Sequence, residues 1–156
     1  MKLGIISDSH DNLGAIEKAV EVFNSESVDM VIHAGDFIAP FTSRIFRKLK
    51  CDLIGIFGNN DGEKFGLRNA FKGIGEIHED PHSFEIGGKK IIVTHHPNIV
   101  DALARCYDIV IYGHTHKVDM RDKMINPGEC GGWLTEKRTV AILLLEEMRA
   151  EIVELR

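Results

Sequence analysis

The sequence lacks long apolar runs, a cysteine framework and an excess of positive charge, and each absence excludes a class of protein. No apolar run approaches the roughly 20 residues that a membrane-spanning helix needs, and the longest run stops at Glu146 and Glu147. The net charge of −5 argues against a dedicated nucleic-acid binder. The three cysteines are widely spaced and odd in number, which predicts reduced thiols and no disulfide framework: Cys51, Cys106 and Cys130.

The chain has 156 residues, of which 44% are hydrophobic and 28% charged, a composition typical of one folded domain. We therefore expect a single domain over residues 1–156, without linkers or internal repeats. The first residues acquire charge too early for a signal peptide, so we expect a cytoplasmic protein without membrane contact. The unusual feature is histidine, which occurs eight times, mostly beside Gly, Asp or Thr.

Apolar runs alternate with helical patterns in the first half of the chain, which predicts parallel strands covered by helices. The expected strands span residues 3–6, 30–32 and 53–57, with one helix capped by Asp11 or Asn12 and another over about 40–49. In the second half, Gly87-Gly88 predicts a hairpin between strands at 83–86 and 89–93. A short helix at 99–106 and strands at 109–112, 118–125, 139–145 and 151–155 complete the prediction.

Polar residues follow five of the predicted strands at the point where each strand ends. Ligand sites of open α/β sheets lie outside the carboxyl ends of the strands, so we expect these five segments to converge. Taken alone, most of them are equally typical of turns or helix caps, and only the paired histidines of the last segment favour metal binding unaided. The segments are Asp8-Ser9-His10, Gly35-Asp36, Gly58-Asn59-Asn60-Asp61, Thr94-His95-His96 and Gly113-His114-Thr115-His116.

Taken together, the five segments offer a set of metal ligands that turn formation does not explain. Imidazole and carboxylate without thiolate disfavour a structural zinc site. The number of groups suits two ions that share one carboxylate, about 3.5–4 Å apart. Imidazole favours Mn, Fe, Co, Ni or Zn over Mg and Ca, and we expect Mn or Ni to be most effective. The candidate ligands are Asp8, His10, Asp36, Asn59, His95, His114 and His116.

The order of these motifs closely resembles that of the calcineurin-like metallophosphoesterases, and especially their short archaeal and bacterial phosphodiesterases. The branch is indicated by Asn60-Asp61 and by Ile125-Asn126-Pro127-Gly128. The resemblance implies an α/β fold, a four-layer α-β-β-α sandwich in which two mixed β-sheets are flanked by helices. It also implies that the first metal is held by Asp8, His10 and His116, the second by Asn59, His95 and His114, and that Asp36 bridges the two.

Two positions depart from the commonest pattern of the family. Asn60 stands where many members have a histidine that contacts the phosphate, and His96 follows His95 where close relatives often have glycine. Asn59 and Asn60 are therefore candidate substrate-binding residues, and Asn60 and His96 are candidate catalytic residues. Both departures leave the ligand set intact, but they leave open which group acts as general acid.

The resemblance implies a metal-dependent phosphoric diester hydrolase, acting on a small or activated phosphodiester by in-line attack of a hydroxide that bridges the metals. Two divalent ions, two carboxylates and a hydroxide leave a local charge of about +1, which attracts an anionic diester. The alternatives are a phosphomonoesterase of the same chemistry and a non-catalytic scaffold, since one retromer subunit resembles this branch. A small phosphodiester is the expected partner, and a homo-oligomer is compatible with the sequence.

Other polar and aromatic residues receive structural interpretations. We expect His33 to pack beside the site or to support a ligand. His78 and His82 flank a predicted turn and are expected to be solvated. Trp133 follows two glycines, and the sequence predicts either that it covers a pocket or that it lies at a subunit interface.

Overall fold

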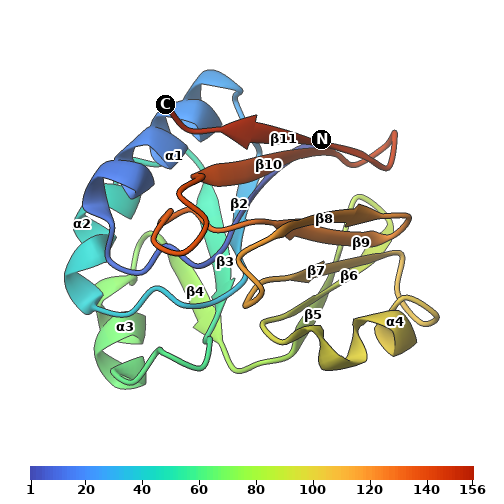
Figure 1. Ribbon diagram of the computed structural model, residues 1–156, viewed down its shortest axis with the longest axis horizontal. Coiled ribbons are helices and arrows are strands. Elements are labelled where there is room, and N and C mark those ends of the chain that lie inside the picture. The colour runs from blue at the N-terminus through green and yellow to red at the C-terminus, as the bar shows by residue number, and fades with distance from the viewer.

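The computed structural model describes residues 1–156 as two β-sheets packed face to face, with helices on their outer faces (Figure 1). Helices α1 (Leu13–Ser25), α2 (Ser43–Phe46) and α3 (Lys64–Ala70) cover the first sheet, and α4 (Val100–Leu103) covers the second. Short 3-10 turns at Pro40–Thr42 and Pro97–Ile99 precede α2 and α4. The predicted four-layer α-β-β-α sandwich is confirmed.

The first sheet has the strand order β11-β10-β1-β2-β3-β4. Strands β1 (Lys2–Ile6), β2 (Met30–His33), β3 (Asp52–Ile56) and β4 (Gly75–His78) are parallel, as helical crossovers require. Strands β10 (Thr139–Leu144) and β11 (Arg149–Glu154) pair with each other, and β10 joins β1 antiparallel. The sheet is therefore mixed, and the carboxyl ends of β1, β2 and β3 lie at one edge.

The second sheet has the strand order β5-β6-β7-β9-β8. Strands β5 (His82–Ile86) and β6 (Lys89–Thr94) form the predicted hairpin, in which Gly87 and Gly88 have φ of +57° and +73°. Strand β7 (Ile109–Tyr112) runs parallel to β6 and to β9 (Met124–Pro127). Strand β8 (Val118–Arg121) pairs antiparallel with β9.

The core lies in layers between the sheets and beneath the helices. Aliphatic side chains of both sheets, among them Ile5, Ile32, Ile91 and Ile111, fill the space between the two sheets. Full burial of such a side chain stabilises the fold by about 1.5–3 kcal/mol relative to exposure. The predicted apolar face of α1 packs on the other side of the first sheet through Ala15, Ile16, Ala19, Val20 and Phe23.

Asn12, rather than Asp11, caps α1, because the Asn12 side chain accepts a hydrogen bond from the backbone N–H of Ala15 at 3.2 Å. Asp11 instead accepts from the backbone N–H of Ala39 at 2.9 Å. The first helix is therefore tied to the loop that leaves β1, where the first of the polar segments begins.

Several elements differ from the prediction. Residues 118–125 do not form one strand, because Asp122 adopts a left-handed φ of +42° and turns the chain between β8 and β9. The helices expected at 40–49 and 99–106 shorten to a 3-10 turn followed by α2 or α4. Neither α3 nor β4 was predicted, since both are short and lack a clear periodicity. The remaining strand boundaries agree to within about two residues.

The expectation of solvated side chains at His78 and His82 is wrong. Both are partly buried, and their rings stack with centroids 3.6 Å apart. His78 ends β4 and His82 begins β5, so the stacked pair links edge strands of the two sheets.

No helix of the structure has the length and apolar content needed to cross a bilayer.

Candidate metal centre

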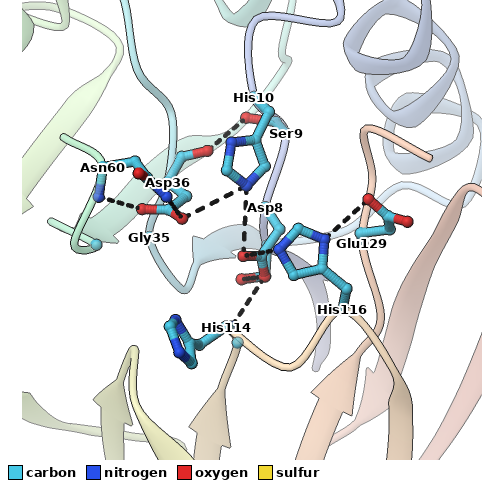
Figure 2. Close-up of polar contacts among 12 residues, drawn as sticks. Asp8, Ser9, His10, Gly35, Asp36, Asn60, His114, His116 and Glu129 are labelled. Atoms are coloured by element: carbon cyan, nitrogen blue, oxygen red, sulfur yellow. Dashed lines mark hydrogen bonds and ion pairs between the residues drawn. The ribbon is translucent and has the colours of Figure 1, made fainter. Parts of the chain in front are cut away.

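The predicted polar segments converge where the carboxyl ends of strands from both sheets meet. Figure 2 shows residues of four of these segments, those with Asp8, Asp36, Asn60 and His114. Loops after β1, β2 and β3 approach from the first sheet, and loops after β6 and β7 approach from the second. A left-handed backbone is uncommon outside glycine, and it clusters at functional sites. Five of the predicted ligands adopt it, with φ between +41° and +67°: Asp8, His10, Asp36, His114 and His116.

Asp8 is shared by two histidines at the centre of the site. Its Oδ1 lies 3.7 Å from Nε2 of His10 and 3.4 Å from Nε2 of His116. Its other oxygen, Oδ2, accepts hydrogen bonds from the Ser7 hydroxyl at 2.6 Å and the backbone N–H of His114 at 3.1 Å. The loops thus hold Oδ2 of Asp8 and leave Oδ1 facing the two imidazoles.

Asp36 contacts both sides of the site. Its Oδ2 lies 3.4 Å from Nε2 of His10 and 3.4 Å from Nε2 of His95. Asn60 donates its backbone N–H to Oδ1 at 2.9 Å and its side-chain amide to Oδ2 at 2.8 Å. Asp36 therefore lies between His10 and His95, and Asn60 orients its carboxylate.

Asn59 and His114 lie on the side of the site where His95 is found. Oδ1 of Asn59 is 2.9 Å from Nδ1 of His114, whose ring centroid is 5.2 Å from that of His95. The ring of His96 is 4.6 Å from the His114 ring, so His96 borders the ligand cluster. Burial, together with His95 and His96, lowers the pKa of His114, which favours the neutral imidazole that binds metals.

The donor set fits a divalent metal ion. Asp8 Oδ1, His10 Nε2 and His95 Nε2 are buried atoms without a hydrogen-bond partner, which is costly unless a ligand satisfies them. Ligand atoms bound at about 2.0–2.2 Å to one ion lie about 3–3.5 Å apart, close to the separations found here. Two overlapping groups have this geometry, Asp8 with His10 and His116, and Asp8 with Asp36 and His95.

The electrostatics of the site favour cations. Burial opposes a charge on His95, but Asp36 outweighs burial and raises the pKa of His95 to about 9. Burial also opposes ionisation of Asp36, yet the nearby His95 ring and hydrogen bonds from Asn60 hold the pKa of its carboxyl below the usual range. Interaction with Asp8 raises the pKa of His10. The two buried carboxylates thus favour positive charge at this site, and a metal ion bound at Nε2 of His10 or His95 would take the place of a proton there.

His33 is a buried packing residue beside the candidate ligands. Its Nε2 lies 3.0 Å from the Ser9 hydroxyl, its Nδ1 accepts from the backbone N–H of Gly35 at 3.2 Å, and its ring stacks on Phe37 at 3.6 Å. Burial holds the pKa of His33 well below its usual value. His33 therefore joins the loops after β1 and β2 and offers no atom to a metal.

Glu129 is a site residue that the sequence analysis did not identify. It is fully buried after β9, and its carboxylate accepts from Nδ1 of His116 at 2.9 Å. It also accepts from the backbone N–H groups of Trp133 and Leu134 at 3.0 and 2.9 Å, and from the backbone and hydroxyl of Thr135. A proton fixed on Nδ1 leaves Nε2 of His116 free to face Asp8. The one feature of the sequence that could have indicated this role is a single acidic residue within a glycine-rich segment, beside Gly128, Gly131 and Gly132.

Two further residues hold the ligand-bearing loops. Asp61 accepts from the backbone N–H groups of Asp36, Ile38 and Gly58 at 2.9, 2.7 and 2.7 Å. Asn126 donates to the Gly113 carbonyl and the Thr115 hydroxyl, each at 3.0 Å. Both residues lie in motifs that the sequence analysis quoted, but hydrogen bonds from other loops give them their role.

Trp133 borders the centre on the side of His10. Its indole Nε1 donates to the backbone carbonyl of His10 at 3.1 Å, and the side chain is 62% exposed. Gly131 allows this placement, because a Cβ there would lie 2.9 Å from Cδ1 of Trp133. The ring therefore forms part of the rim of the centre.

Replacing Glu129 by Ala is expected to weaken metal binding about 10–100-fold, because His116 loses the group that orients it. Glu129→Gln retains an acceptor oxygen and should recover part of the loss. Calorimetric titration of metal-free protein with Mn measures the effect. The control is Glu136→Gln, which alters an exposed acid of the same loop. Equal affinity of the Glu129→Ala variant and the unaltered protein would contradict this role.

Comparison with known proteins places this arrangement in a family. Residues 1–148 match the family model of the calcineurin-like phosphoesterase superfamily domain. The chain is 43% identical over 157 residues to the phosphodiesterase MJ0936 of Methanocaldococcus jannaschii, covering 94% of this chain and 95% of that protein. The solved structure of an archaeal phosphodiesterase matches with a TM-score of 0.92 and 42% identity, over 99% of this chain and 100% of that one.

More distant structures share the fold alone. Vps29 of Chaetomium thermophilum matches with a TM-score of 0.71 but only 14% identity, over 99% of this chain and 95% of that one. The family assignment therefore depends on the match over residues 1–148 and on the archaeal relative. The chain belongs to the calcineurin-like phosphoesterase superfamily.

Proposed function

We propose that this chain is a metal-dependent phosphodiesterase that hydrolyses a small or activated phosphodiester with two divalent ions. The observation that carries the proposal is the set of unpartnered buried ligand atoms of Asp8, His10 and His95 around the carboxylate of Asp36. Support also comes from the relative named a phosphodiesterase, which is 43% identical and of nearly the same length.

In this proposal the ligands divide between two positions joined by Asp36. The first position is formed by Asp8, His10 and His116, and the second by Asn59, His95 and His114. When bound, the ions lower the pKa of water and neutralise charge on the phosphoryl oxygens. The chain itself sets the protonation of the ligands: Glu129 holds the proton of His116 on Nδ1, and Nδ1 of His95 donates to the Ala34 carbonyl at 2.8 Å.

Asn60 is the residue of the proposed mechanism that meets the substrate. One amide N–H of Asn60 is engaged by Asp36, and the residue is exposed at the rim of the centre. An amide has a second N–H, which we assign to a phosphoryl oxygen. Because an amide cannot transfer a proton at neutral pH, the site favours diesters whose leaving group departs without protonation.

Chelator-treated protein is expected to be inactive on bis(4-nitrophenyl) phosphate and to recover with Mn or Ni but poorly with Mg. The reason is the four imidazole ligands, which favour softer ions than an all-oxygen site does. The measurement is the initial rate after each metal is added to the same metal-free preparation. Equal recovery with Mg alone would contradict the ligand argument.

The same assay separates the diesterase from a monoesterase. We expect the rate on bis(4-nitrophenyl) phosphate to exceed that on 4-nitrophenyl phosphate at equal concentration. A higher rate on the monoester would favour the phosphomonoesterase. No metal-dependent hydrolysis of either ester would leave only a non-catalytic role for the site.

A further inference from the structure

A cavity of about 320 Å³ adjoins the candidate metal centre and has His116 in its lining. Its volume is near the lower end of the range for small-molecule sites, so it suits a single functional group. It is formed where the chain enters β8 and β10. Its lining is His116, Lys117, Val118, Thr135, Lys137 and Thr139.

The charge of this cavity is unusual for an acidic protein. Its lining includes two lysines and no carboxylate. The lysines that form ion pairs elsewhere in the structure are Lys2, Lys18, Lys48, Lys64 and Lys90. Lys117 and Lys137 are exposed and have no such partner. Two unpaired ammonium groups at one concave surface create a local positive potential within a chain of net charge −5.

The walls of the cavity are held in place by the same network that holds the metal ligand. Thr135 donates its hydroxyl to Glu129 at 2.7 Å, and Glu129 in turn accepts from His116 at 2.9 Å. Thr139 is 7% exposed, its backbone N–H donates to the Glu129 carbonyl at 3.0 Å, and its hydroxyl has no protein partner. The cavity thus offers two ammonium groups and one free hydroxyl next to the centre.

We propose that this cavity binds a phosphate-sized oxyanion, and that the preferred substrate carries a second phosphate group besides the scissile diester. The inference deepens the proposed function and rests on it, because His116 lines this cavity and also belongs to the candidate metal centre. Lys117 and Lys137 neutralise the second phosphate, and the Thr139 hydroxyl donates to it. Free inorganic phosphate would bind the cavity by the same contacts as a phosphate group of the substrate. The experiment therefore has one arm for free phosphate and one for the substrate.

The first arm measures binding without catalysis. Metal-free protein is titrated with inorganic phosphate while its backbone amide resonances are followed by NMR. Saturable shifts are expected at Lys117, Val118, Lys137 and Thr139, and they are expected to disappear in Lys117→Gln/Lys137→Gln. Lys50→Gln/Lys72→Gln removes the same charge from exposed, unpaired lysines elsewhere and should keep the shifts. Absence of saturable shifts, or shifts that persist in the cavity variant, would overturn the inference.

The second arm measures the preference between two substrates. Thymidine 5′-(4-nitrophenyl phosphate) is compared with the same compound carrying a 3′-phosphate, in Mn-loaded protein. The 3′-phosphate is expected to lower KM about five- to tenfold, and the cavity variant should bring the ratio of the two KM values close to one. The single variants Lys117→Gln and Lys137→Gln should give intermediate ratios, which separates the effect from misfolding.

The two arms fail independently of the proposed function. Lysine-dependent phosphate binding without any hydrolysis would contradict the proposed function and support the cavity. Lysine-dependent binding with equal KM values would assign the cavity to free phosphate and remove it from substrate recognition. Hydrolysis of both nucleotides without phosphate binding in the cavity would overturn this inference alone.

Discussion

Replacing Asp36 by Asn is expected to reduce hydrolysis of bis(4-nitrophenyl) phosphate by more than the ~100-fold seen for residues that only support a metal ligand. Asp36 contacts Nε2 of both His10 and His95, so the substitution removes the negative charge from the centre of both candidate positions. Asparagine is close in shape and keeps an acceptor for Asn60, so the fold should persist. The measurements are the initial rate and the bound metal of the same sample.

The matched control for that substitution is Asp52→Asn, which removes an exposed carboxylate at the start of β3. It should leave both rate and metal content unchanged. An Asp36→Asn protein that retained nearly full activity and metal content would remove Asp36 from the bridging position and with it the shared-carboxylate arrangement.

Asn60→His is expected to raise the rate on alkyl phosphodiesters far more than the rate on aryl ones. A ribose alkoxide needs a proton to leave, whereas nitrophenolate does not, and general acid help is typically worth about 10²–10⁴-fold. Asn60 already contacts Asp36 with its backbone and its side chain, so an imidazole at this position would lie at the rim of the centre. The measurement compares the alkyl-to-aryl rate ratio of the variant with that of the unaltered protein.

His96 is the competing candidate for the general acid. Its ring lies 5.3 Å from that of His95 and 4.6 Å from that of His114. If His96→Ala selectively lost alkyl-diester activity while Asn60→His gained none, the acid would be His96. Asn60 would then bind the substrate, and its position would not be that of the general acid. A selective gain in Asn60→His with little change in His96→Ala is the result that we expect.

The candidate site could be predicted from the sequence because its residues follow strands. Parallel strands end at one edge of a sheet, so an apolar run followed by Asp8, Asp36 or His95 already defines a place in the fold. The structure brings the five segments together: ligand atoms of Asp8, His10, Asp36, His95 and His116 form two groups, and Asn59 and His114 lie beside His95. The two-sheet architecture, in contrast, was predicted from the family resemblance alone, because the periodicity of apolar residues does not specify how two sheets face each other.

The residues that were missed depend on contacts between distant loops. Glu129 acquires its role only because residues 133–135 fold back onto it and His116 points toward it. The stacked His78 and His82 rings depend on how two sheet edges meet, so their neighbouring turn was a misleading guide. In the same way, the turn at Asp122 requires a left-handed backbone that the pattern of apolar residues does not indicate.

The stoichiometry of metal binding tests the central proposal most directly. Metal-free protein is titrated with Mn while bound metal and the rate on bis(4-nitrophenyl) phosphate are followed together. Seven ligands around a shared Asp36 predict that both quantities reach their plateau at two equivalents per chain, and that His114→Ala binds about one. A plateau at one equivalent, or full activity in the presence of chelator, would contradict the two-ion phosphodiesterase.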